Sequence, residues 1–294
     1  MTGEFAALGR LLERLAPPAA GEVGAGDDAA VLAGGVVVAV DPVVEGVHFL
    51  RSLTSLADAG WKALARNVSD VAAMGAEPWC CVASVVGADE GDLAHLYDGL
   101  LAAASHWACP VVGGDLAAGP ALVLTVTALG RLPTGAAPLL RSTARPGDGL
   151  YVSAPLGWGA AGLRALRAGT ASASPAEAWY ARPEPSVEVA MEARSAGATA
   201  AIDISDGLSQ DLDHLAVASG VGLRLDDVPV AAGATLEDAL HGGDEYHLAF
   251  SCPDRRAGQA AVPGIRIGTC TTDPGERTFR GAALPVGGGW EHSL

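Results

Sequence analysis

Aspartates recur in this chain where an apolar segment runs into a glycine- or serine-containing turn. The segment AIDISDGLSQDLDHL, residues 201–215, contains Asp203, Asp206, Asp211 and Asp213. The same design occurs in GAGDDAAV, VVVAVD, NVSD and VVGGDL, which supply Asp27, Asp28, Asp41, Asp70 and Asp115. Burying a carboxylate is costly unless it is solvated, paired or bound to a metal. The recurrence of this design therefore predicts cation ligands.

Few cationic side chains are available to pair with these carboxylates. Lys62 is the only lysine and is followed by alanine, which excludes the G-x-x-x-x-G-K-[ST] phosphate loop. A bound polyphosphate would need arginines, backbone N–H groups and divalent ions to offset its charge. Clusters of carboxylate oxygens favour Mg²⁺, which is commonly shared between carboxylates and phosphates. The pattern therefore indicates Mg²⁺ together with a phosphorylated ligand.

Each motif also has a purely structural interpretation. GDD alone is typical of a turn or a helix cap, and DISDG fits a strand, a turn and a capped helix as well as it fits a ligand pair. Asp211 and Asp213 fall within a predicted helix, and we expect both on its solvated face. His48, in EGVHF, is typical of a core histidine, and Trp290 fits either C-terminal packing or stacking on a ligand ring.

Other functional classes find no support in the sequence. The seven histidines lack zinc-site spacing, and neither a nucleophile elbow nor a G-x-G-x-x-G fingerprint occurs. The net charge of −16 argues against nucleic acid or an anionic membrane as a partner. No apolar run reaches the ~18 residues of a membrane span. The five cysteines lack metal or redox spacing, so we expect reduced thiols in a cytoplasmic protein.

Alternating strands and helices must position the aspartates. In the first part of the chain we predict strands 36–41, 80–87 and 121–130 and helices 54–74 and 92–107. In the second part we predict strands 150–154, 199–205 and 245–250 and helices 159–169, 186–197 and 210–220. The proline- and glycine-rich stretch 131–149 predicts the boundary between two domains, 1–135 and 136–294. The fold class is therefore α/β, in layers, and one parallel doubly wound sheet is the alternative.

The motifs, in this order, resemble those of thiamine-monophosphate kinases. The matching segments span nearly the whole chain and include GDDAAVL, EGVHF, GWKALARNVSDVAAMGAEP, VVGGD, RSTARPGD, RPEP, DISDGLSQDLDHLAVASGVG, GGDEY and GGGWEHSL. The resemblance extends to a superfamily of ATP users that includes aminoimidazole ribonucleotide synthetase. It implies that superfamily's two-domain fold, in which the N-terminal domains pair through their sheets into a homodimer and an α/β domain follows.

The resemblance also implies a reaction and the residues that serve it. The reaction is ATP- and Mg²⁺-dependent phosphorylation of thiamine monophosphate to thiamine diphosphate. The implied Mg²⁺ ligands are Asp28, Asp41, Asp70, Asp115, Asp203 and Asp206. The implied ATP contacts are Gly114, Asp115, Arg141 and Ser205, and the implied contacts to thiamine monophosphate are His48, Asp244 and Trp290. The acceptor phosphate is already largely ionised at neutral pH, so no general base is expected.

Several positions depart from the family pattern. Ala39 and Val40 stand where two hydroxyl residues commonly precede the strand aspartate, and Leu116 stands where a threonine often follows GGD. GGDEYH replaces GGEDYE, which shortens the carboxylate at Asp244 by one methylene and places His247 where an acid is common. Two alternatives therefore stay open: a relative that binds nucleotide and metal without turnover, and a kinase for another small phosphorylated metabolite.

Overall fold

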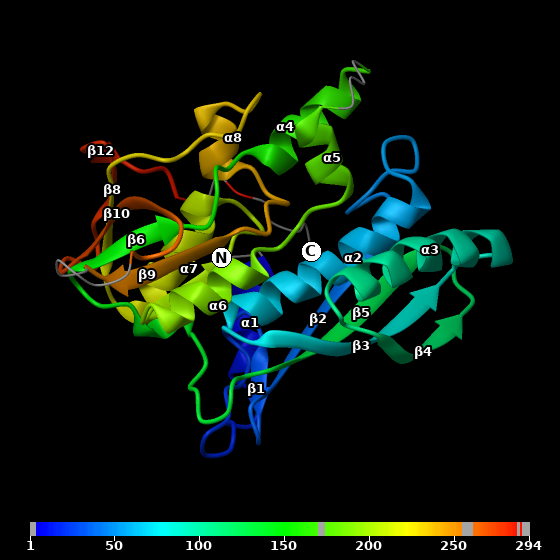
Figure 1. The fold of residues 1–294 in the computed structure, drawn as a ribbon, viewed down its shortest axis with the longest axis horizontal. Coiled ribbons are helices and arrows are strands. Elements are labelled where there is room, and N and C mark those ends of the chain that lie inside the picture. Colours follow the sequence, from blue (N-terminus) through cyan, green and yellow to red (C-terminus); the bar gives the residue numbers. More distant parts are fainter. Residues whose placement is uncertain (1–3, 170–173, 255–260, 287–288, 290–294) are drawn as a thin grey trace.

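Two mixed β-sheets organise the computed structural model, which describes residues 4–169, 174–254, 261–286 and 289 (Figure 1). The strands of the first sheet are β1 (Ala30–Leu32), β2 (Val36–Val44), β3 (Glu77–Val86), β4 (Val111–Ala117) and β5 (Val123–Arg131). Their spatial order is β1-β2-β5-β3-β4, and every pair is antiparallel except β3–β4.

The second sheet belongs to the second part of the chain. Its strands are β6 (Asp148–Val152), β7 (Ala200–Asp203), β8 (Gly222–Leu225), β9 (Leu248–Pro253), β10 (Ile265–Thr271), β11 (Arg277–Phe279) and β12 (Ala282–Ala283). Their order is β12-β11-β8-β10-β6-β9-β7. Two largely antiparallel sheets confirm the α/β class and show that the alternative of one parallel sheet is wrong. The division of the chain at residue 135 stays a prediction.

Helices cover both sheets. The long predicted helices, 54–74 and 92–107, agree closely with the observed bounds of the corresponding helices. The helices are α1 (Glu4–Leu12), α2 (Leu56–Ala73), α3 (Glu90–His106), α4 (Trp158–Arg167), α5 (Pro175–Ala181), α6 (Val187–Ser195), α7 (Leu208–Ser219) and α8 (Leu236–His241), with the 3₁₀ turn η1 (Arg141–Thr143). No helix in the described residues combines the length and apolar character that a membrane crossing requires.

Helix α2 is the element that both halves share. It packs on β2 and β5 through fully buried apolar residues such as Leu64 and Val68, and it also contacts β7 and α6 of the second half (Figure 1). Helix α3 lies close against it: a Cβ at Gly99 would stand 1.6 Å from the carbonyl oxygen of Ala57. Only glycine allows this approach. The position of α2 is therefore fixed from both sides.

Two of the predicted aspartate positions differ in the structure. Asp41 lies inside β2 and not at its end, because the strand continues through Pro42 to Val44. Proline is tolerated there because β1 pairs only with the start of β2 and leaves the rest of that edge open. Asp115 lies within β4, an edge strand. We did not predict this strand because the two glycines of VVGGDL are unfavourable in strands.

Candidate active site

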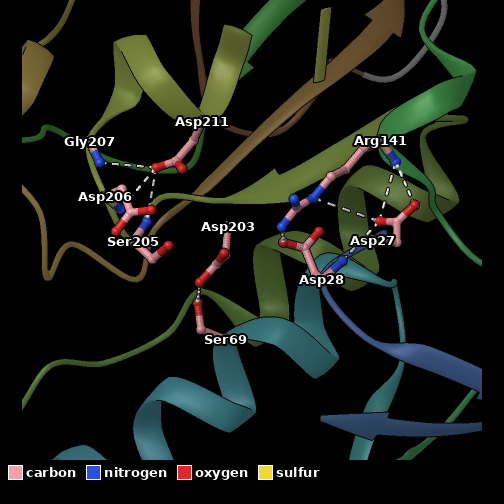
Figure 2. Close-up of polar contacts among 9 residues, drawn as sticks. All are labelled: Asp27, Asp28, Ser69, Arg141, Asp203, Ser205, Asp206, Gly207 and Asp211. Atoms are coloured by element: carbon pink, nitrogen blue, oxygen red, sulfur yellow. Dashed lines mark hydrogen bonds and ion pairs between the residues drawn. The ribbon is translucent and has the colours of Figure 1, made fainter. Parts of the chain in front are cut away.

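Three aspartates from distant parts of the chain meet between the two sheets. Asp28 lies in the loop before β1, Asp70 in α2 and Asp203 at the end of β7. Each offers a carboxylate oxygen, and these oxygens lie within 4.8 Å of one another. Figure 2 shows Asp28 and Asp203 facing the same space, where Asp203 accepts a 2.8 Å hydrogen bond from the Ser69 hydroxyl of α2.

The electrostatics of this cluster favour a bound cation. Burial raises the pKa of Asp70 well above its usual range, and Asp203 and Asp41 add to the effect. Burial likewise raises the pKa of Asp203, with Asp28 as the next cause. Within the described residues, Asp28 also has a buried carboxylate oxygen without a hydrogen-bond partner. An oxygen-only donor set of this kind fits a hard divalent ion such as Mg²⁺.

An arginine in the connection between the sheets lies against the N-terminal aspartates. The Arg141 side chain donates to Asp28 at 2.6 Å, and its backbone N–H donates to Asp27 at 3.1 Å (Figure 2). Burial, with help from Asp28, raises the pKa of Asp27 to about 6. Arg141 therefore partly neutralises one side of the cluster and fixes η1 to the loop before β1.

The DISDG turn is held in place by an aspartate that we expected on a solvated helix face. Asp211 is 3% exposed, and one of its oxygens accepts the backbone N–H groups of Ser205, Asp206 and Gly207 at 3.0, 3.2 and 3.0 Å (Figure 2). The expectation was wrong because the turn folds back over the first turn of α7. Burial and Asp206 raise the pKa of Asp211 to about 8, and the N–H groups act in the opposite direction. Asp213 is half-buried and pairs with Arg277 at 2.6 Å.

The carboxylate cluster opens into a cavity of about 580 Å³ between the two halves. The predicted site residues that line it are Asp28, Asp41, His48, Asp70, Arg141, Asp203, Ser205, Asp206 and Asp244. His48 belongs to the loop 45–53, and its Nδ1 accepts the Val44 N–H at 3.0 Å. Apolar side chains of this loop and of α4 line the part of the cavity near His48: Val47, Leu50, Leu53 and Leu163.

Asp244 is fixed by contacts that the sequence did not reveal. Lys62 of α2 donates to one of its oxygens at 3.0 Å and Tyr246 to the other at 2.6 Å. Lys62 is fully buried and also lies 3.9 Å from the centre of the Tyr180 ring. Burial acts to raise the pKa of Asp244, but Lys62 and Arg66 outweigh it and hold the pKa at about 2. Asp244 is therefore a permanent anion in the cavity wall.

Two predicted positions in the described part of the chain are not brought into this cavity. Gly114 and Asp115 lie on the exposed strand β4 and do not line it. Strand packing explains the glycine at position 114, because a Cβ there would stand 1.9 Å from the carbonyl oxygen of Ala83 on β3. Trp290 lies outside the described residues.

Comparison with known proteins gives a consistent family. Residues 26–132 match the AIR synthase related protein N-terminal domain, and residues 145–263 match the corresponding C-terminal domain. The chain is 36% identical to the thiamine-monophosphate kinase of Salmonella typhimurium, over 98% of this chain and 97% of that protein. It is 37% identical to that of Methanopyrus kandleri, over 86% and 85%. The chain belongs to the thiamine-monophosphate kinase family.

A solved structure of the family supports the same arrangement. The structure described as AaThiL complexed with AMPPCP and TMP matches 99% of this chain and 97% of its own, with a TM-score of 0.87 and 29% sequence identity. The predicted resemblance and the predicted fold are thus confirmed over essentially the whole chain. This chain is accordingly a kinase of that family.

Sequence reasoning missed several polar residues that help build this kinase's cavity. Lys62, Arg66 and Ser69 precede the predicted Asp70 at helical spacing on α2, and each of the three contacts the second half or lines the cavity. The signal was present in WKALARNVSD as a polar stripe on an otherwise apolar helix. Sequence reasoning used Lys62 only to exclude a phosphate loop.

His247 does not act as a base in this kinase. It is 5% exposed, its ring lies 4.5 Å from that of Trp179, and its Nδ1 is 3.1 Å from the Ser186 hydroxyl. Burial lowers the pKa of His247 from 6.5 to about 4, so the ring is neutral at physiological pH. It does not line the cavity. The histidine that replaces an acid here is a packing residue.

We predict that truncation of Asp211 destabilises the protein much more than truncation of Asp213. Asp211→Ala leaves one buried and two partly buried N–H groups without their acceptor, so it should lower the free energy of unfolding by about 2–3 kcal/mol or more and reduce turnover. Asp213→Ala is the matched control and should lower it by less than about 1 kcal/mol, because it removes one partly exposed ion pair. Urea unfolding measures both. Equal losses would contradict the assigned role of Asp211.

The neutral state of His247 predicts a pH dependence of stability. Protonation is favoured in the unfolded chain below pH 6.5 but in the folded chain only below about 4. The stability contribution is therefore full above pH 6.5 and is lost as the pH falls towards 4. When the pH falls from 7.5 to 4.5, the free energy of unfolding should decrease by about 2–3 kcal/mol less in His247→Gln than in the parent protein. The control variant His95→Gln, at an exposed site on α3, should show the same decrease as the parent protein.

Proposed function

We propose that this kinase transfers the γ-phosphoryl group of ATP to the phosphate of thiamine monophosphate, giving thiamine diphosphate and ADP, with Mg²⁺ as the metal. The observation that carries the proposal is the cluster of Asp28, Asp70 and Asp203 at one end of a cavity that a phosphorylated two-ring compound can fill. The bound AMPPCP and TMP named for the AaThiL structure support it.

The cluster serves the nucleotide end of the cavity. Asp28, Asp70 and Asp203 would hold Mg²⁺, with Asp41 and Asp206 close enough to line the same space. Bound Mg²⁺ would supply charge neutralisation between two polyanions, which repel by ~4 kcal/mol per pair of unit charges at 4 Å and an effective dielectric near 20. Arg141 adds a cation beside Asp28, and the Asp211-braced turn presents Ser205 and Asp206 towards the same end.

The opposite end suits the organic part of the acceptor. The apolar wall of Val47, Leu50, Leu53 and Leu163 can cover flat rings, and the Tyr180 ring is beside it. Asp244 supplies a fixed negative charge, which complements the permanently cationic thiazolium ring of thiamine monophosphate. The side chains of this end therefore select for a cationic, ring-containing phosphate ester.

The reaction requires no protein base. The acceptor phosphate has a second pKa near 6 and is largely ionised at pH 7. Among the described residues that line the cavity, the one histidine is His48, whose Nδ1 accepts the Val44 N–H. The chain's contribution is to align two phosphates and to neutralise their charge, as in other phosphoryl transfers.

We infer further that two chains form a homodimer through the first sheet. Five large apolar side chains on β2–β4 are more than a third exposed: Val40, Trp79, Val82, Val112 and Leu116. The register places Val40 and Val82 on opposite sides of Thr127 on one sheet face, and β4 has an unpaired edge. Exposed strand edges and apolar patches favour association. In such a dimer, Gly114 and Asp115 would serve the partner's cavity.

A turnover assay tests the function. With ATP and Mg²⁺, the protein should convert thiamine monophosphate to thiamine diphosphate and leave free thiamine unchanged. Asp203→Asn should reduce kcat roughly 100-fold or more, because several kcal/mol of charge stabilisation depend on the metal. Asp98→Asn, at an exposed site on α3, should retain the parental rate. Binding of AMPPCP without any product would instead establish a binding protein, and turnover of a different phosphate ester would change the substrate.

Subunit complementation tests the dimer and the place of Asp115. Asp115→Asn and Asp203→Asn should each be inactive alone, yet co-refolded mixtures should regain about a quarter of the activity, since half the dimers contain one intact site of two. The matched control is a mixture of Asp203→Asn and Asp206→Asn, which should stay inactive because both residues serve the same protomer's site. No recovery in the first mixture would place Asp115 outside the partner's site. Sedimentation equilibrium should give the mass of a dimer.

A further inference from the structure

Arg66 is a cavity-lining cation to which the proposed reaction assigns no role. It lies on α2 one helical turn before Asp70 and one turn after Lys62, on the helix face that looks into the cavity. Its side chain is 16% exposed, so the guanidinium is largely withdrawn from bulk solvent. An arginine in such a place is always charged and carries five N–H donors in a planar fork.

The hydrogen bonding of Arg66 is incomplete. Its Nε donates to Asp41 at 3.3 Å, a long single contact. Across residues 4–169, 174–254, 261–286 and 289, its two terminal nitrogens have no hydrogen-bond partner. By contrast, Arg141 is engaged by Asp28 and Lys62 by Asp244. A guanidinium that is anchored at Nε and keeps its terminal donors for the cavity is suited to bind an anion.

The position of Arg66 along α2 indicates which anion. Asp70, four residues later, belongs to the metal cluster, and Lys62, four residues earlier, fixes Asp244 at the end with the apolar wall. The helix rise puts Lys62 and Asp70 roughly 12 Å apart along the axis, with Arg66 midway. An acceptor whose rings lie by Asp244 and whose phosphate points to the metal cluster must carry that phosphate past Arg66.

The charge of the cavity gives the same indication. The aspartates that line it are Asp28, Asp41, Asp70, Asp203, Asp206 and Asp244, and the arginines are Arg66, Arg141 and Arg167. A doubly charged phosphate would be repelled from this lining except beside a metal or an arginine. Arg141 lies against Asp27 and Asp28 at the nucleotide end, and Arg167 is an exposed residue at the end of α4. Among the described residues that line the cavity, Arg66 is the cation between the two ends.

We propose that Arg66 binds the phosphate of the acceptor and holds it towards the metal cluster. This inference rests on the proposed function and adds to it a residue that distinguishes a phosphorylated acceptor from its free alcohol. Asp41 fixes the plane of the guanidinium through Nε. The two terminal nitrogens offer the parallel donors that match two phosphate oxygens.

Binding measurements test this assignment independently of turnover. By calorimetry, Arg66→Gln should raise the Kd for thiamine monophosphate roughly 10- to 100-fold, as expected for the loss of a charged hydrogen-bonded pair, and should leave the Kd for AMPPCP with Mg²⁺ unchanged. Arg66→Lys should fall between, because lysine keeps the charge but loses the fork. The matched control is Arg182→Gln, which removes another arginine that pairs with α2, through Asp58 at 2.6 Å, outside the cavity lining.

Each outcome decides the assignment. A selective loss of thiamine monophosphate affinity supports it. An equal loss of affinity for both ligands would mean that Arg66 only supports the shape of the cavity. The assignment would also be wrong if neither affinity changed or if only the affinity for AMPPCP fell. If the parent protein itself fails to bind thiamine monophosphate, the proposed function fails. In that case pyrophosphate serves as the probe. If Arg66→Gln leaves the Kd for pyrophosphate unchanged, Arg66 is not an anion-binding residue either.

Discussion

Repulsion among carboxylates from opposite halves of the chain is the constraint on which this structure depends. Asp28 and Asp70 come from the first half and Asp203 from the second, and their oxygens lie within 4.8 Å of one another. Such a group is costly to assemble from a chain with few cations. The fold tolerates it because hydrogen bonds from Ser69 and Arg141 hold two of the three in place. The remaining repulsion favours either protonation, as the raised pKa values of Asp70 and Asp203 indicate, or a bound cation.

Helix α2 holds several of the polar cavity residues in fixed positions. Its apolar side is buried against the first sheet, and its polar stripe faces the second half through Lys62, Arg66, Ser69 and Asp70. The close approach of α3 at Gly99 leaves the helix little freedom to move along the sheet. Lys62, Arg66 and Asp70 therefore keep a fixed separation along one rigid element. Such preorganisation is what alignment of two phosphates requires.

The sequence predicted the long elements, and most of the site residues that it predicted line the cavity. The reasons for its failures are physical. Apolar periodicity located α2 and α3, and the strand-turn pattern of DISDG brought Asp203, Ser205 and Asp206 to the right place. Sheet order and strand direction could not follow from local patterns, because antiparallel pairing joins distant segments. Asp211 was misplaced because helical spacing alone does not reveal a turn that folds back and supplies three N–H donors.

The departures at Asp244 and His247 acquire different meanings once their surroundings are known. His247 is neutral, buried and outside the cavity lining, so it adds no charge to the cavity. Asp244 lines the cavity, and the shortening of its side chain is accompanied by contacts to Lys62 and Tyr246 that occupy both oxygens. Its charge is thus kept while its reach is reduced. Under the proposed function, a change in acceptor preference would therefore concern the size of the ring system, because Asp244 itself stays ionised.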